Sequence, residues 1–186
     1  LLEIYPKKKL KNTKKKKFKI AFILSKWLYK DDKDKILSTI RTTSQIKNTQ
    51  IIIKPHTRGM VLDEKIPNNV LIADNSYHTR SIIQDSDVII FTRSSIFLDA
   101  ILLNKQLIHL SYATNVDLAS NALNSCKVFS QEDLIQKLGL IKLGRKIYTQ
   151  NDRKKCLSTY AGKDNGKMLD NLLREIKAHI NVSYKL

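Results

Sequence analysis

Basic and hydroxyl side chains gather in three short segments, and each segment follows an apolar run. These segments are residues 54–59 (KPHTRG), 74–78 (DNSYH) and 92–95 (TRSS). Lysine and arginine neutralise phosphate charge, and helix termini after strands supply further donors to phosphate oxygens. The pattern therefore predicts a site for phosphate, with the phosphate carried by a nucleotide.

The hydroxyl and acidic candidates also have plainer explanations. Ser94 or Ser95 can be a helix N-cap, which contributes about 1 kcal/mol. Because the two serines are paired after a buried run, we favour phosphate binding over capping alone, and we expect the neighbouring Arg93 to bind the phosphate with them. Asp99 lies one turn into the expected helix, where it can accept hydrogen bonds from ribose hydroxyls or favour the helix dipole.

The basic candidates are open to the same two readings. His56 titrates near neutral pH and can bind or protonate a phosphate oxygen, although a loop histidine is commonly structural. Lys54 and Arg58 can neutralise phosphate charge, or they can be ordinary surface cations of a basic chain. We carry all three forward as candidates, with His56 as the catalytic one.

The elements that must position these residues alternate between strands and helices. The apolar runs predict strands at 18–24, 50–54, 70–73, 87–92, 107–110 and 127–129. Helical spacing of apolar residues predicts helices at 31–46, 77–84, 95–103, 131–138, 151–159 and 167–180. This alternation favours an α/β fold, a doubly wound (Rossmann-like) parallel sheet of about five to six strands with flanking helices. In such a sheet the three polar segments converge at the carboxyl ends of the strands.

Length and charge set the domain organisation. With 186 residues the chain suffices for one α/β core, and we expect a basic arm or linker at 1–17 and a nucleotide-binding domain at 18–186. Residues 7–17 hold eight lysines; with Glu3 they bring the arm to +7 of the formal +17. Such basicity favours anionic partners, including an anionic membrane surface through residues 7–17. The arm can equally be a solvated linker.

Several function classes find no support in the residues. The two cysteines form no metal or redox spacing, and no paired carboxylates indicate a metal, so we expect no metal and no cofactor. The chain lacks a Walker loop, a GxGxxG segment and a nucleophile elbow. No zinc finger or aromatic-rich RNA-binding strand is present, which makes nucleic acid a disfavoured partner. No apolar run is long enough to cross a bilayer.

Two stretches resemble the donor-binding, C-terminal half of GT-B-type glycosyltransferases of surface polysaccharide synthesis. The branch of CDP-glycerol glycerophosphotransferases, Kdo transferases and capsule enzymes typically shows K-P-H-P, then S-D-V-x-I-T-D-Y-S-S with an acid soon after, and G-K-P. Matching residues here are Lys54-Pro55-His56, Ser86-Asp87-Val88-Ile89-Ile90, Ser94-Ser95, Asp99-Ala100 and Lys105. The departures are Thr57, Thr92-Arg93, Asn104 and Gln106. A weaker likeness lies at 162–167 (GKDNGK).

The resemblance implies roles and partners. It implies that Ser94 and Ser95 hold the donor diphosphate, that His56 contacts its phosphates, and that Asp99 lies near the ribose or the transferred group. The implied partners are a nucleotide-activated sugar or polyol and a glycan or lipid-linked acceptor. From the two widely separated cysteines and the lack of a long apolar run, we expect a cytoplasmic protein or one peripheral on the inner face of the membrane. Such enzymes also use an N-terminal acceptor domain, so this chain is expected to be one half of the active unit.

Two other functions stay open. Sugar-nucleotide 2-epimerases share this fold in their halves, but they need further acids and an arginine in the cleft, and these are not recognisable in this sequence. A noncatalytic module that binds phosphate or nucleic acid can use the same fold with the basic arm.

Overall fold

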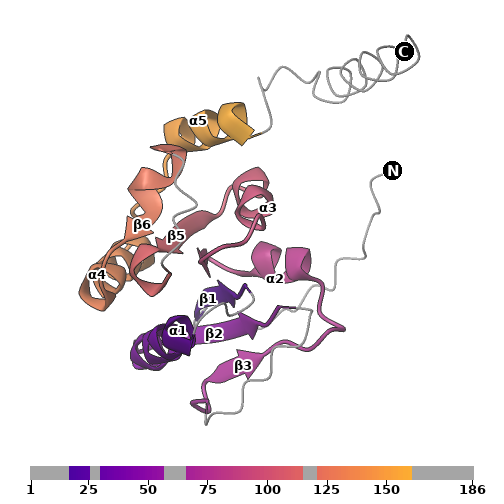
Figure 1. Ribbon diagram of the computed structural model, residues 1–186, viewed down its shortest axis with the longest axis vertical. Helices are drawn as coiled ribbons and strands as arrows, with labels where there is room; N and C mark the ends of the chain where they lie inside the picture. Colours follow the sequence, from indigo (N-terminus) through magenta and orange to yellow (C-terminus); the bar gives the residue numbers. More distant parts are fainter. Residues whose placement is uncertain (1–16, 26–29, 57–65, 115–120, 161–186) are drawn as a thin grey trace.

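A computed structural model describes residues 17–25, 30–56, 66–114 and 121–160 (Figure 1). The strands are β1 (Phe18–Ile23), β2 (Thr49–Lys54), β3 (Val70–Ile72), β4 (Val88–Phe91), β5 (Gln106–Leu110) and β6 (Lys127–Val128). The helices are α1 (Lys30–Ser44), α2 (Thr79–Asp85), α3 (Phe97–Leu102), α4 (Gln131–Lys142) and α5 (Gln150–Tyr160), with 3-10 turns η1 (Ser111–Ala113) and η2 (Asn121–Cys126). These elements confirm the expected order of strands and helices. The predicted helix at 167–180, the segment 162–167 and residues 1–16 of the basic arm lie outside the described residues.

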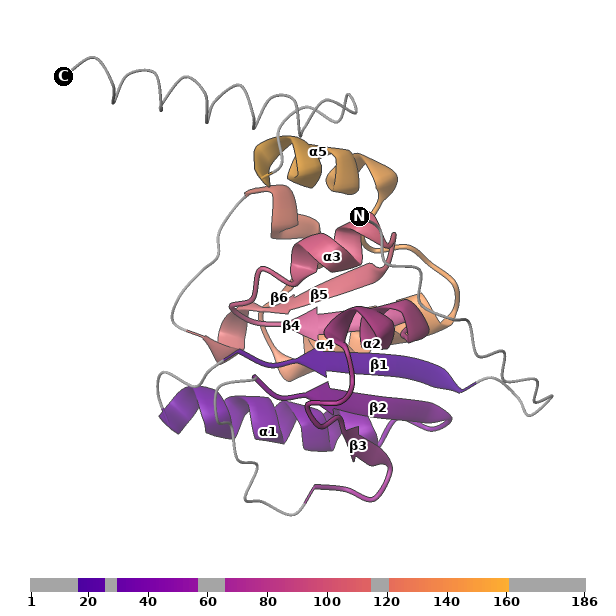
Figure 2. The same ribbon diagram turned by 90° about the vertical axis from the view of Figure 1, so that its right-hand side faces the viewer.

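The six strands form one parallel sheet in the order β3-β2-β1-β4-β5-β6 (Figure 2). This is the strand order of doubly wound sheets, and it confirms the predicted fold class. The central strands are buried on both faces, which is why they appear in the sequence as unbroken apolar runs. In β4, for example, Val88 to Phe91 are all at most 1% exposed.

Helices cover both faces of the sheet (Figure 1). On one face, Ile20 and Phe22 of β1 pack in a core with residues of α1 and α4, such as Ile40 and Leu138. On the other face, Ala21 and Ile23 share a core with residues of α2, α3 and α5, which include Ile83, Ile101 and Leu157. Successive β1 side chains therefore enter opposite cores, as the alternation of a strand requires.

Asn104 and Gln106, which differ from the family motif on either side of Lys105, have structural roles at the start of β5. Asn104 follows α3 with φ of 54°, a left-handed conformation in which glycine is common and asparagine is tolerated. The Gln106 side chain accepts hydrogen bonds from the backbone N–H groups of Ile147 and Tyr148 and donates one to the Tyr148 carbonyl. Gln106 thereby fixes the segment between α4 and α5 to the sheet.

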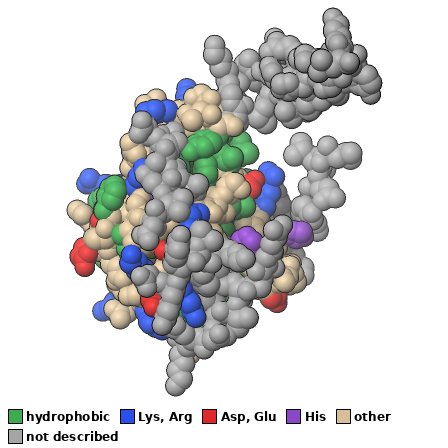
Figure 3. All heavy atoms as spheres, in the orientation of Figure 1, with side chains coloured by type: hydrophobic (Ala, Val, Ile, Leu, Met, Phe, Trp, Pro, Cys, Tyr) green, Lys and Arg blue, Asp and Glu red, His purple; other side chains and the backbone are tan. Residues whose placement is uncertain are grey.

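Basic side chains are spread over the visible surface and are not gathered in one patch (Figure 3). In Figure 3 lysine and arginine side chains are scattered over the face shown, with acidic side chains among them. Among the described residues, no helix has the length and apolar character needed to cross a bilayer.

Candidate functional site

The candidate site lies where β1 and β4 end side by side. The chain leaves β1 toward α1 on one face and leaves β4 toward α3 on the other, so the two loops diverge at this point of the sheet. Open α/β sheets bind ligands at such a switch point. Ser25 and Thr92 lie just beyond the two strands, and their buried hydroxyl oxygens are 2.8 Å apart in a hydrogen bond. This bond joins the two loops at their base.

Ser94 and Ser95 occupy the loop between β4 and α3. The Ser94 hydroxyl oxygen accepts a long hydrogen bond from the Ile96 N–H, at 3.4 Å. Ser95 is exposed, and among the described residues its hydroxyl makes no hydrogen bond. Both serines can therefore donate a hydroxyl proton to an incoming group.

The alternative explanation, that one of these serines caps α3, is not supported by the structure. The helix begins at Phe97, its N-cap residue is Ile96, and no side chain makes a capping bond there. Ile96 already has helical angles (φ −59°, ψ −18°), so a turn precedes the helix and the serines lie too far upstream to cap it. Because α3 has only six residues, its dipole is also a smaller contribution than the expected helix 95–103 implied.

Arg93 makes an ion pair across the switch point. One guanidinium nitrogen, Nη2, lies 3.0 Å from Oδ2 of Asp32 in the first turn of α1, and the two side chains are 11% and 2% exposed. The remaining atoms Arg93 Nη1 and Asp32 Oδ1 are buried and have no hydrogen-bond partner among the described residues. Arg93 was predicted from the sequence as a phosphate ligand; in the structure its charge is already balanced by Asp32.

Lys54 and His56 lie at the end of β2, next to β1. Lys54 is buried, and its Nζ donates to the Asp74 carbonyl over 2.6 Å. Two hydrogen bonds from Ser76 hold the pKa of the exposed Asp74 carboxyl below its usual value, and the positive charge of Lys54 adds a smaller effect in the same direction. His56 is half-buried two residues after Lys54. Arg58 lies outside the described residues.

Asp99 lies in the first turn of α3, one turn beyond Ser95, and is half-buried. The structure thus brings Arg93, Ser94, Ser95 and Asp99 together along one loop and helix, with Lys54 and His56 at the end of β2, two strands away from β4. Asp32 and Ser25 are not among the residues expected from the sequence. An acid in the first turn of a helix is ordinary, and only the fold shows that Asp32 faces an arginine 61 residues further along the chain.

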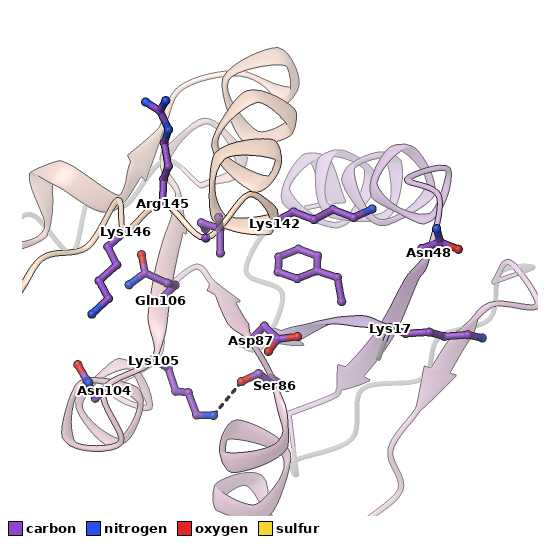
Figure 4. A pocket seen from close by; sticks show the side chains of 13 residues that line it. Lys17, Asn48, Ser86, Asp87, Asn104, Lys105, Gln106, Lys142, Arg145 and Lys146 are labelled. Atoms are coloured by element: carbon purple, nitrogen blue, oxygen red, sulfur yellow. Dashed lines mark hydrogen bonds between the residues drawn. The ribbon is translucent and has the colours of Figure 1, made fainter. Parts of the chain in front are cut away.

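A cavity of about 780 Å³ opens at the opposite edge of the sheet, around the amino ends of β1 and β5 (Figure 4). None of the candidate residues from the sequence lines this cavity. Its lining residues are Lys17, Phe18, Asn48, Ser86, Asp87, Asn104, Lys105, Gln106, Ile141, Lys142, Gly144, Arg145 and Lys146. The cavity is therefore separate from the candidate nucleotide site.

No protein family and no curated protein sequence matches this chain. Solved structures do match its fold. The spinosyn rhamnosyltransferase SpnG superposes with a TM-score of 0.61 at 13% identity, covering 86% of this chain and 46% of that chain. The UDP-GlcNAc 2-epimerase of Methanocaldococcus jannaschii gives a TM-score of 0.54 at 14% identity, covering 87% and 46%.

The wall teichoic acid polymerase TagF, as its H444N variant, gives a TM-score of 0.50 at 16% identity, covering 94% of this chain and 47% of that chain. This chain therefore spans about half the length of the three structures. At these identities the likeness shows the fold alone: an α/β unit equivalent to one half of a GT-B-type protein.

Proposed function

We propose that this chain is the donor-nucleotide-binding domain of a glycosyltransferase or glycerophosphotransferase in surface polysaccharide synthesis. The observation that carries the proposal is the position of Ser94 and Ser95. Their hydroxyls lie beyond the carboxyl end of β4 at the switch point, and Ser95 makes no hydrogen bond with its side chain in the described part of the chain. Two hydroxyls at this position suit a diphosphate.

We assign the roles that the sequence and its resemblance suggest. Ser94 and Ser95 hydrogen-bond the donor diphosphate, while the Arg93–Asp32 ion pair holds their loop against α1. Lys54 and Arg58 contribute positive charge, and Asp99, one turn along, accepts from the ribose or the transferred group. His56 contacts or protonates a phosphate oxygen as the bond to the donor breaks. The reaction is a direct displacement at a phosphate-activated donor, stabilised by these fixed charges and donors.

The acceptor, a glycan or lipid-linked chain, would bind to a second domain across the site. We further propose that the protein acts in the cytoplasm or at the inner face of a membrane, with residues 7–17 contacting anionic lipid. The strength of the fold match to TagF and SpnG supports a transferase domain but does not select the donor.

Calorimetric titration with CMP, CDP, UDP and GDP tests the proposal. We expect saturable binding of one nucleotide diphosphate, and we expect the double change Ser94→Ala and Ser95→Ala to abolish it. The matched control is Ser81→Ala with Ser158→Ala, two exposed serines on α2 and α5. Weak binding of all four nucleotides that is indifferent to Ser94 and Ser95 would refute a donor site at this loop.

One fold match favours a second candidate function. The M. jannaschii 2-epimerase superposes about as well as TagF does, so an epimerase half fits the same fold. If the chain, combined with an acceptor domain, released a free sugar epimer from a nucleotide sugar, the epimerase function would replace the transferase function. If the chain is a noncatalytic module, changing Ser94 and Ser95 to alanine should not affect its binding of any of the nucleotides.

A further inference from the structure

The cavity at the amino edge of the sheet is bordered mainly by positive charge. Its lining includes five cationic side chains and a single carboxylate, Asp87. Oδ2 of Asp87 already accepts a hydrogen bond from the Lys19 backbone N–H. The cations are Lys17, Lys105, Lys142, Arg145 and Lys146. An excess of cations over acids in a concave site raises the local concentration of anions.

Helix ends explain two of these cations. Helices run antiparallel to the strands here, so their carbonyl ends lie near this edge and attract positive charge. Lys105 Nζ donates to the carbonyls of Gln84 and Ser86 at 2.6 and 2.9 Å, at the end of α2. Lys142 Nζ donates to the Lys47 carbonyl, after the end of α1. Both lysines thus have structural partners.

Helix ends do not explain Arg145 and Lys146. The last carbonyls of α4 are closed by backbone N–H groups: Gly144 donates to Ile141 over 2.8 Å, and Arg145 donates to Leu140 over 3.0 Å. The side chains of Arg145 and Lys146 are exposed and make no hydrogen bond or ion pair with any described residue. In Figure 4 the Arg145 side chain points away from the other labelled side chains, and the Lys146 side chain extends the opposite way, on the side of Asn104 and Lys105. Their charges are available to a ligand.

A second source of charge joins the fold at the same place. Lys17, on the rim of the cavity, is the last residue of the lysine-rich tract 7–17. It is exposed and makes no side-chain bond with a described residue. The densest run of positive charge in the sequence therefore ends at a residue that borders this cavity.

We propose that this cavity binds a small oligophosphate anion at a site distinct from the candidate nucleotide site. Its volume of about 780 Å³ is within the range of sites for small molecules. The uncommitted cations come from two separate parts of the chain, so an anion with several phosphate groups contacts more of them than a single phosphate does. The Arg145 guanidinium can hold a phosphate through two parallel hydrogen bonds, and Lys146 and Lys17 add point charges.

Titration with inorganic tripolyphosphate, followed by calorimetry at moderate salt, tests this site on the whole chain. Arg145→Gln with Lys146→Gln should weaken binding about tenfold or more, because two charge-assisted contacts are lost. The matched control is Lys154→Gln with Lys155→Gln, two exposed neighbours on α5 that remove the same charge. Arg145→Gln with Lys146→Gln should leave the binding of CDP or UDP at the loop after β4 unchanged, which separates this site from the proposed function.

Each outcome of this titration either supports or overturns the oligophosphate site. Saturable tripolyphosphate binding that only the Arg145/Lys146 variant loses supports the site. Equal losses in the cavity variant and the α5 control would overturn it, because they would mean that net charge alone attracts the anion. Absence of tripolyphosphate binding would also overturn it. If the protein then bound vesicles containing phosphatidylglycerol, or a single-stranded oligonucleotide, Arg145 and Lys146 would belong to a surface that binds a membrane or nucleic acid.

Discussion

At the residue scale, the Arg93–Asp32 ion pair joins two parts of the candidate site through a 3.0 Å contact. The two side chains are almost fully buried and join the loop after β4 to the first turn of α1. Removing one partner of a buried ion pair leaves the other charge without compensation, and this costs more than the pair contributes relative to an apolar replacement. Because Arg93 directly precedes Ser94, the same contact fixes the start of the loop that carries Ser94 and Ser95.

Asp32→Asn tests this role. We expect a loss of about 3 to 5 kcal/mol in the free energy of unfolding, measured by urea denaturation, because the Arg93 cation stays buried without its counter-charge. The control is Asp85→Asn, which removes the exposed 4.0 Å pair between Lys19 and Asp85 and should cost less than about 1 kcal/mol. Similar losses for both variants would contradict a buried, structural pair.

The two cysteines give a prediction for alkaline pH. Burial, and to a smaller degree the neighbouring Cys156, raises the pKa of the Cys126 thiol to about 12. Burial also raises the pKa of Cys156. Unfolded cysteine loses its proton near pH 8.5. Between that pH and about 12 the unfolded state binds fewer protons than the folded state, so stability is complete below pH 8.5 and falls as the pH rises.

Urea denaturation at pH 7.5 and at pH 9.5 measures this loss. We expect a smaller free energy of unfolding at pH 9.5, and a smaller decrease for Cys126→Ala, which lacks one of the titrating groups. A decrease of the same size in that variant would mean that Cys126 titrates alike in both states.

At the element scale, the strands were predictable because buried parallel strands appear as continuous apolar runs. The runs around Ile20, Ile52, Ile89 and Ile108 all became strands of one sheet. The start of α3 was not predictable from the same signals. A paired serine before an apolar helical pattern indicates an N-cap, yet Ile96 adopts helical angles first, and this depends on how the loop closes over the sheet.

The capping difference predicts unequal effects of serine changes. Ser130 caps α4, and its side chain accepts from the Asp133 N–H at 3.1 Å. Ser130→Ala should therefore cost about 1 kcal/mol in thermal or urea denaturation. Ser94→Ala with Ser95→Ala should cost less than about 0.5 kcal/mol, since neither hydroxyl caps α3. If the double variant proved the less stable of the two, the serines would be structural and the main reason to assign them to a ligand would disappear.

The candidate site itself was only partly predictable. The loop 92–95 could be placed at the edge of the sheet from strand order alone, because every parallel strand ends on the same side. The partners of its side chains could not, because Asp32 and Ser25 lie more than 60 residues earlier in the chain. Lys54 illustrates the same limit: its type suggested phosphate, and its bond to the Asp74 carbonyl depends on the loop after β3.

At the scale of the whole molecule, positive charge is widespread and should attract any polyanion weakly. The chain carries a formal charge of +17, and basic side chains are spread over the face in Figure 3. Binding of this kind releases counter-ions and falls steeply with salt concentration. Specific contacts at a formed site are less sensitive to salt.

A salt series separates these two modes. We expect a single-stranded oligonucleotide to bind at low salt and to lose affinity by at least about tenfold near 200 mM salt, in fluorescence anisotropy. The Ser94/Ser95 alanine variant should behave identically in this assay. Sequence-dependent oligonucleotide binding that persists at 200 mM salt would favour the nucleic-acid module over the donor domain.

We propose above that the loop after β4 holds a nucleotide diphosphate at the switch point. The most direct measurement is a titration of the ¹⁵N-labelled chain with CDP and with UDP, followed through the backbone amide signals. We expect one of them to shift the amides of residues 92–97 in a saturable way, and we expect Ser94→Ala with Ser95→Ala to remove the shifts. Shifts confined to Arg145 and Lys146 at the opposite edge, or no saturable shifts at all, would contradict it.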